Sequence, residues 1–199
     1  EKYYLFLFVA LVPWTFFSTC LSSGTTVIIS QQDMIKKIYF PREILPFSFV
    51  IAQFVNMLLS FVVVFAIVII SGVPFNLEAI LFLPLIMLIE FVLALGCTMI
   101  VCAFTVYFRD MEHIVSVMTM AWMYLTPVVY PVDMVPEKFV RLFYLNPMTS
   151  LTIAYRDILY YGQKPQLETL LLAIVMGVTF LIIGFWSFNK MQRRFAEEL

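Results

Sequence analysis

Glu90 is the acidic residue that the sequence places in the most apolar surroundings. It is the one charged residue between Glu78 and Arg109. A carboxylate in such a stretch is costly unless it faces protein or water, or carries a proton. Three interpretations follow: a proton relay, an acid hydrogen-bonded between helices, or a side chain near the edge of the apolar layer.

Asp110, Glu112 and His113 bring metal-ligating side-chain types together in the segment 107–114, YFRDMEHI. A metal site needs three or four converging ligands, and the sequence offers no second ligand cluster to complete one. We therefore expect no metal here. The segment instead predicts a solvated hinge, in which Arg109, Asp110 and Glu112 bond to the ends of neighbouring helices.

Residues 31–43, QQDMIKKIYFPRE, combine charges with two aromatic side chains. Asp33 and Lys37 have the favourable acid-first i,i+4 spacing, which predicts a short helix that ends before the next proline. Tyr39 and Phe40 beside these charges suit the docking of a soluble partner. An interfacial loop with snorkelling lysines is the alternative, and the residues alone leave both open.

Residues 126–162 are divided by four prolines. The pattern predicts one short helix over 136–145, a break at Asn146 and Pro147, and a second helix over 148–161. Neither helix is long enough to cross a bilayer, so both are re-entrant or interfacial. Irregular backbone at membrane depth is tolerated only where protein or a water-filled path covers it. This segment therefore indicates a conduit with an external gate.

Patterns typical of enzymes are missing from the sequence. It contains no G-x-x-x-x-G-K-[ST] phosphate loop, no G-x-S-x-G motif and a single histidine. A catalytic site needs several converging polar groups, which these residues do not supply. We therefore predict a transport subunit, not an enzyme. The net charge of −1 gives no reason to expect nucleic acid as a partner.

The composition explains what kind of molecule must position these residues. Of 199 residues, 63% are hydrophobic and 13% charged, and the mean hydropathy is +0.98. Soluble domains carry about 25% charged residues, so this chain is neither a soluble globule nor disordered. Long charge-free stretches without β-barrel alternation predict an all-α polytopic membrane protein. The five predicted transmembrane helices cover 5–29, 46–71, 79–106, 114–131 and 169–189.

Cysteines and glycines within the predicted spans indicate how the helices pack. Cys20, Cys97 and Cys102 fall inside predicted spans, so we expect them to pack in the core. In the last span, Gly177 and Gly184 lie seven residues apart and mark a face for close helix association.

The charges between the spans predict the orientation of the chain. The loops 31–43 and 107–113 and the C-terminal tail share one side and hold seven of the 12 Lys and Arg residues. Short basic loops stay in the cytoplasm, which places the C-terminus there and the first residue outside. Because the chain opens on Glu1, we expect an N-terminal truncation that removes a preceding span.

Four stretches together resemble a known family. They are IKKIYFPREILP (35–46), YFRDMEHI (107–114), LTPVVYPVDMVPEKF (125–139) and YLNPMTSL (144–151). In order and spacing they are similar to ABC-2 type transporter permeases, in particular those that export O-antigen, capsular polysaccharide or teichoic acid. The resemblance covers essentially the whole chain.

This resemblance implies a single ABC-2 type transmembrane domain over 1–199, with a cytoplasmic coupling segment at 31–43 and external gate helices at 133–162. The full family has six spans and an N-terminal interface helix. The permease would form a homodimer in the bacterial cytoplasmic membrane, in contact with membrane lipids and a glycan or lipid-linked polymer. This chain would hold no cofactor, because ATP and Mg bind a separate ATP-binding cassette subunit.

The resemblance also carries over residue by residue. The residues that match the ATPase coupling segment are Lys36, Lys37, Tyr39, Phe40, Pro41, Arg42 and Glu43. Those that match the gate are Pro136, Glu137, Arg141, Asn146, Pro147 and Arg156. Aromatic side chains similar in type and place to those along the glycan path are Trp14, Phe17, Trp122, Tyr124 and Tyr130.

The implied cargo is a lipid-linked polysaccharide or teichoic-acid polymer, exported by ATP hydrolysis. An exporter of drugs or small lipids of the same ABC-2 type is the closest alternative. An ion-coupled secondary transporter that uses Glu90 is a further alternative, although the sequence shows no inverted repeat of the kind such transporters often carry.

Overall fold

The computed structural model describes residues 2–37, 40–72 and 76–195, leaving aside the side chains of Glu137, Arg141, Leu142 and Arg194. All regular structure in these ranges is helical, which confirms the predicted all-α class. The α-helices are α1 (Tyr3–Ser22), α2 (Gln32–Lys37), α3 (Ile44–Ile70), α4 (Leu77–Ile80), α5 (Leu83–Tyr107), α6 (Met111–Leu125), α7 (Glu137–Tyr144), α8 (Pro147–Leu159) and α9 (Leu167–Met191). Short 3-10 turns lie at Gly24–Thr26, Ile29–Gln31, Val132–Met134 and Gln192–Arg194.

Among the described residues, four helical segments are long and apolar enough to cross a membrane: Tyr3–Thr26, Ile44–Ile70, Leu77–Tyr107 and Leu167–Met191. They correspond to four of the five predicted spans, and the chain is a multi-pass membrane protein.

The remaining predicted span, 114–131, is represented by the 15-residue helix α6. Fifteen residues of helix rise about 22 Å, less than the hydrocarbon core of a bilayer. The helix ends at Leu125 because the next residue precedes Pro127, whose ring disfavours helical backbone before it. Thr126 accordingly has extended angles, with φ −105° and ψ 134°.

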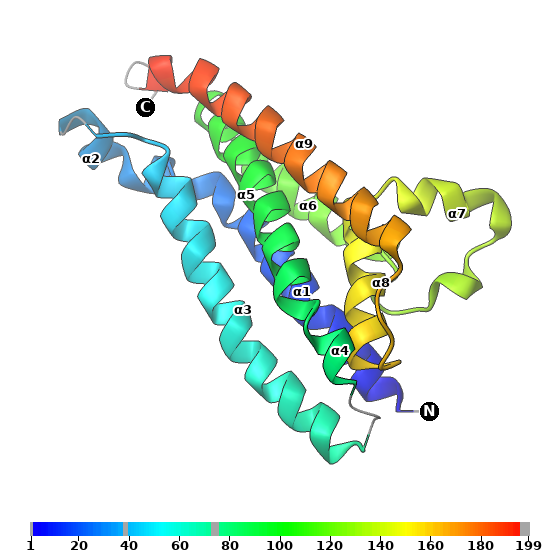
Figure 1. Cartoon of the computed structure of the whole chain (residues 1–199). Coiled ribbons are helices and arrows are strands. Elements are labelled where there is room, and N and C mark those ends of the chain that lie inside the picture. The colour runs from blue at the N-terminus through cyan, green and yellow to red at the C-terminus, as the bar shows by residue number, and fades with distance from the viewer. Residues whose placement is uncertain (1, 38–39, 73–75, 196–199) are drawn as a thin grey trace.

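The bundle has two ends with different segments (Figure 1). One end carries α2, the α5–α6 turn and the C-terminal end of α9, and we call it the coupling end. The Tyr107 hydroxyl donates to the Met191 carbonyl there, at 2.8 Å. The opposite end, the gate end, carries the N-terminus and α4, with α7 projecting beside α8. The three segments that the charges place on one side of the membrane therefore lie at the same end of the molecule.

Helices α5 and α9 pack backbone against backbone. A Cβ atom built on Gly96 would lie 2.5 Å from the backbone of Phe180 and Leu181, and one built on Gly184 would overlap the Gly96 carbonyl oxygen. Gly177 faces the Ile89 carbonyl oxygen, at 3.4 Å from an added Cβ. The predicted association face of the last span is thus confirmed as an intramolecular contact with α5.

The three cysteines are free and buried in this helix bundle, as packing residues. The Thr98 hydroxyl donates to the Cys20 carbonyl at 3.1 Å and joins α5 to α1.

Candidate functional site

The predicted coupling segment is bonded to the end of α9. The Arg42 guanidinium donates to the carbonyl of Gln192. The Gln192 side-chain amide in turn donates to Glu43 Oε1 at 3.2 Å. These two bonds join residues that are 150 and 149 positions apart in the chain. They link the start of α3 to the end of α9 at the coupling end.

A cavity of about 900 Å³ lies beside this link. Its walls include six of the seven predicted coupling residues, and α9 and the following turn supply the opposite wall through Asn189, Gln192 and Arg193. The six are Lys36, Lys37, Phe40, Pro41, Arg42 and Glu43. Tyr39 lies outside the described residues. Cationic side chains outnumber the single carboxylate in this lining, which suits contact with an acidic surface of a soluble partner.

The predicted hinge lies between α5 and α6. Arg109, Asp110 and Glu112 are all exposed. Glu112 is in the first turn of α6, where a negative charge is favourable beside the helix N-terminus. Asp110 occupies the N-cap position of α6, but its side chain makes no capping hydrogen bond. The three side chains are thus exposed at the turn between α5 and α6, and their role as a hinge stays a prediction.

Asn146 joins the end of α6 to the start of α8. Its Oδ1 caps α8 by accepting from the Met148 amide at 3.0 Å, and it also accepts from Trp122 Nε1 at 3.0 Å. Its Nδ2 donates to the Thr126 hydroxyl at 2.8 Å. Pro147 follows as the first residue of α8, where proline is well tolerated. The predicted break between two short helices is therefore present and is held by one amide side chain.

Arg156 fixes the segment after α6 against α8. Its guanidinium donates to the carbonyl oxygens of Pro127 at 2.6 Å and Val128 at 2.7 Å. The same group lies 3.5 Å from the centre of the Phe6 ring on α1. Burial lowers the pKa of Arg156 to about 10, so it stays a cation at neutral pH. Carbonyl dipoles and the ring face compensate the buried charge.

The other predicted gate residues belong to α7 and its start. Pro136 is exposed directly before α7. The side chains of Glu137 and Arg141 lie outside the described part of the structure.

Glu90 is an interhelical acid in this structure. The Tyr155 hydroxyl of α8 donates to Glu90 Oε2 of α5 at 2.6 Å, and both side chains are fully buried. The Tyr155 ring stacks on Phe61 of α3, with 5.5 Å between ring centres. Glu90 Oε1 has no partner among the described residues. Of the three interpretations from the sequence, the structure shows the acid hydrogen-bonded between helices. The sequence did not identify Tyr155 as the partner of Glu90.

The five predicted path aromatics occupy different surroundings. Phe17 is fully buried and meets the Trp122 ring edge-on at 5.4 Å, so within this chain it packs between α1 and α6. Trp14 is nearly buried and borders a groove described below. Tyr124 is 72% exposed, and its carbonyl accepts from the Tyr130 hydroxyl at 2.7 Å. The Trp14 ring centre also lies 6.0 Å from that of Phe17, so Trp14, Phe17 and Trp122 form one ring cluster, while Tyr124 and Tyr130 form a separate pair.

Polar side chains line a groove between α1 and α6. It has a volume of about 200 Å³, and its polar lining is Trp14, Ser18, Ser22, Ser116 and Thr119. Ser18 donates to the Thr15 carbonyl at 3.1 Å, and Thr119 donates to the Val115 carbonyl at 2.7 Å. Both hydroxyl oxygens can still accept a hydrogen bond from a polar neighbour.

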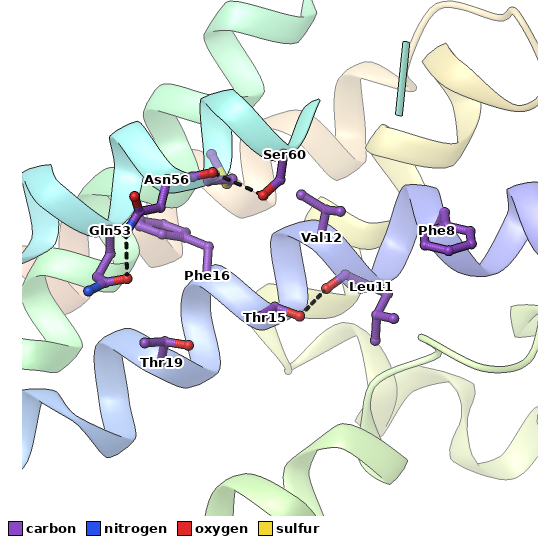
Figure 2. A pocket seen from close by; sticks show the side chains of 10 residues that line it. Phe8, Leu11, Val12, Thr15, Phe16, Thr19, Gln53, Asn56 and Ser60 are labelled. Carbon is purple, nitrogen blue, oxygen red and sulfur yellow. Dashed lines mark hydrogen bonds between the residues drawn. The ribbon is translucent and has the colours of Figure 1, made fainter. Parts of the chain in front are cut away.

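A second groove, of about 220 Å³, lies between α1 and α3 (Figure 2). Its polar side chains are Thr15, Thr19, Gln53, Asn56 and Ser60. Asn56 donates to Gln53 Oε1 at 3.4 Å, and the Ser60 hydroxyl donates to the Asn56 carbonyl. The sequence analysis missed these residues, although two amides in the middle of the span 46–71 were a visible signal.

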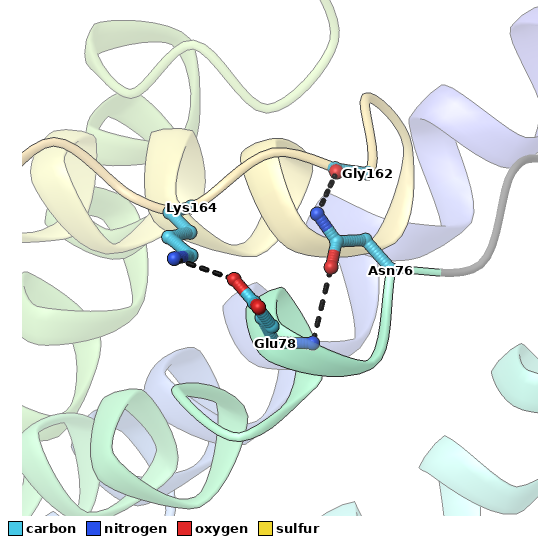
Figure 3. A network of polar contacts seen from close by, with 4 residues as sticks. All are labelled: Asn76, Glu78, Gly162 and Lys164. Atoms are coloured by element: carbon cyan, nitrogen blue, oxygen red, sulfur yellow. Dashed lines mark hydrogen bonds and ion pairs between the residues drawn. The ribbon is translucent and has the colours of Figure 1, made fainter.

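A polar network closes the gate end beside α4 (Figure 3). Asn76 Nδ2 donates to the Gly162 carbonyl at 3.1 Å, and its Oδ1 accepts from the Glu78 amide. Lys164 pairs with Glu78 at 2.6 Å. The segment between α8 and α9 is therefore bonded to the start of α4, which positions the C-terminal end of α8.

Comparison with known proteins gives a consistent result. The family model for the ABC-2 type transporter matches residues 2–160. The chain is 33% identical over 196 residues to the O-antigen export system permease protein RfbA of Myxococcus xanthus, covering 98% of this chain and 75% of that protein. It is 30% and 31% identical over 198 residues to two O-antigen export system permease proteins RfbA of Klebsiella pneumoniae, covering 100% of this chain and 76% of each.

Proposed function

Because the chain belongs to the ABC-2 type transporter family, we propose that it is the permease subunit of an ATP-driven exporter of lipid-linked polysaccharide. The observation that carries this proposal is the similarity to three O-antigen export permeases along 98–100% of the chain. The arrangement of the bundle supports it, since the basic coupling segment and the segments predicted to form the gate lie toward opposite ends.

In this proposal the coupling end faces the cytoplasm and contacts the ATP-binding partner. The partner holds ATP and Mg, while this chain supplies the segment 31–43 and the C-terminal turn after α9. Two copies of the permease assemble in the bacterial cytoplasmic membrane, with the gate end outside. The bias of Lys and Arg toward the coupling end supports this orientation.

A continuous series of contacts connects the coupling segment to the gate. Arg42 and Glu43 are bonded to the end of α9 through Gln192. Helix α9 packs on α5 with direct contact between the two backbones at Gly96 and Gly184. Helix α5 is bonded to α8 through Glu90 and Tyr155. We propose that movement of the coupling segment reaches α8 along these contacts, since packed backbones transmit displacement well.

Helix α8 then controls the segment after α6. Asn146 and Arg156 hold residues 126–130 in place from the two ends of α8. A shift of α8 would release these carbonyl groups and open the exit.

The translocation path, in this proposal, runs along α1. Helix α1 contributes to both polar grooves, the one with α6 and the one with α3. Several hydroxyl groups in these grooves donate to carbonyls of their own helix, and they can exchange those hydrogen bonds with sugar hydroxyls as a polymer passes. Trp14 and Tyr124 offer ring faces of the kind on which sugars stack.

Two single substitutions in the coupling segment test the proposal. The permease and its ATPase partner are reconstituted in vesicles, with Phe40→Ala and Arg42→Ala compared with wild type. We expect glycan export to fall about tenfold or more while the partner continues to hydrolyse ATP, because Arg42→Ala loses the bond to Gln192 and Phe40→Ala loses a ring from the cavity wall. Lys190→Ala, a cation at the same end but outside the segment, is the matched control and should export normally. Unchanged export by both coupling variants would contradict the proposal.

A further inference from the structure

A separate cavity lies at the gate end. It is bordered by the start of α1, the turn Val132–Met134 and the C-terminal ends of α7 and α8. Its volume is about 380 Å³, within the range of small-ligand sites. Phe6 and Pro131 contribute apolar walls. Its polar lining consists of Asp133, Tyr144, Arg156, Asp157, Tyr161 and Gln163. We call it the exit cavity.

The Asp157 carboxylate in this cavity has no partner. It is half-buried, and no hydrogen bond or ion pair of its side chain occurs within the described ranges. The neighbouring Arg156 directs its terminal nitrogens to the carbonyls of Pro127 and Val128, and no ion pair joins it to Asp157 within the described ranges. Burial raises the pKa of Asp157 to about 6, so it is ionised at neutral pH. Its oxygens are therefore free to accept hydrogen bonds from a ligand.

Aromatic rings lie beside this carboxylate. Tyr161 is 48% exposed, and its ring is held edge-on against Tyr160 with 4.9 Å between centres. Tyr144 lines the cavity from the end of α7. The ring faces can stack on a ligand. The adjacent carboxylate can accept hydrogen bonds from it, and the Gln163 amide can both donate and accept them.

The charges in the lining disfavour an anionic ligand. Two carboxylates, Asp133 and Asp157, line the cavity with one guanidinium, whose terminal nitrogens donate to backbone carbonyls. A phosphate group would meet two carboxylates against a single guanidinium, which costs affinity. A ligand with several hydroxyl groups and no negative charge fits all of these features.

We propose that the exit cavity binds an uncharged sugar unit of the exported polymer, a step that rests on the proposed function as a glycan exporter. The sugar stacks on the tyrosine rings, and its hydroxyls donate to Asp157. Because Arg156 both lines the cavity and holds residues 127 and 128, the bound sugar lies directly beside the gate. The site therefore selects neutral glycans over phosphate-rich polymers such as poly(glycerol phosphate).

Calorimetric titration of the permease in lipid nanodiscs, free of sugar detergents, tests this inference. The probes are uncharged tetrasaccharides of mannose, galactose and glucose, and a glycerol-phosphate tetramer. We expect at least one neutral tetrasaccharide to bind and the glycerol-phosphate tetramer not to bind. Asp157→Asn and Tyr161→Ala should each weaken that binding about tenfold, the size expected for losing one charge-assisted hydrogen bond or a stacking contact.

Glu168→Gln is the matched control, since it makes a similar carboxylate-to-amide change at the exposed start of α9, outside the cavity. It should bind the tetrasaccharide as wild type does. The inference is overturned if no neutral tetrasaccharide binds, if the glycerol-phosphate tetramer binds equally well, or if neither cavity variant weakens binding. Because the assay needs neither ATP nor the partner subunit, such a result would leave the proposed export function intact.

Discussion

At the scale of single residues, the buried polar groups near the gate belong to pairs that the chain brings together from distant positions. Glu90 and Tyr155 are 65 residues apart, and Arg156 reaches carbonyls 28 and 29 residues away. The sequence singled out Glu90 from its apolar surroundings, and the family resemblance pointed to Arg156. The hydrogen-bond partners of these two residues could not be predicted from the sequence. Backbone carbonyls, and a tyrosine on the apolar face of a helix, have no recognisable sequence pattern.

Tyr155→Phe tests whether Glu90 is a structural acid. The change removes the hydroxyl that donates to Glu90 and leaves the buried carboxyl group without a partner, so we expect a loss of about 1–3 kcal/mol in the free energy of unfolding. The thermal unfolding midpoint of the permease in nanodiscs measures it. Tyr160→Phe is the matched control and should unfold as wild type does, since its hydroxyl has no bond among the described residues.

Glu90→Gln completes this test. Its amide oxygen can still accept from Tyr155, so the variant should remain folded and transport-competent. A Glu90→Gln protein that folds but transports nothing would support ion coupling through this carboxyl group instead.

At the scale of helices, the sequence predicted elements well where local chemistry determines them. Residues 136–145 and 148–161 were predicted as two helices, and the structure has Glu137–Tyr144 and Pro147–Leu159. Proline and an Asx cap act within a few residues, so their effect is visible in the sequence. The span at 114–131 was extended too far, because apolar residues continue beyond Pro127 while the helix stops at Leu125.

The packing partners of α8 were not predictable from the sequence. We expected a re-entrant or interfacial helix, and most of its side chains are buried against α1, α5 and α9. Its three buried hydroxyls Thr149, Ser150 and Thr152 have no hydrogen-bond partners in the described part of the chain. A polar helix within an apolar bundle depends on tertiary contacts, which hydrophobic periodicity alone does not reveal.

Gly184→Ala tests the close contact between α5 and α9. The added methyl group would overlap the Gly96 carbonyl, so the two backbones must separate, and we expect destabilisation of about 1–3 kcal/mol. Thermal unfolding and the yield of folded permease report it. Gly177→Ala, whose methyl group would sit 3.4 Å from the Ile89 carbonyl oxygen, should cost clearly less. Equal stability of the two variants would show that this contact does not hold the helices together.

At the scale of the whole molecule, the chain separates two tasks along one helical bundle. Basic and aromatic residues gather with the end of α9 at the coupling end. At the gate end, Asn146 and Arg156 hold the segment 126–130 that follows α6. The scarce charges of the sequence predicted this division, since they lie between the apolar spans. The sequence did not reveal the exit cavity, whose lining comes from four separate segments.

The most direct test of the account is transport itself, measured with the wild-type permease and its ATPase partner in sealed vesicles. With the coupling end and the partner facing the medium, we predict that lipid-linked glycan added to the outer leaflet becomes protected inside the lumen only when ATP is hydrolysed. A proton gradient without ATP should move none. Glycan uptake driven by the gradient alone, or ATP hydrolysis with no protected glycan, would contradict the account.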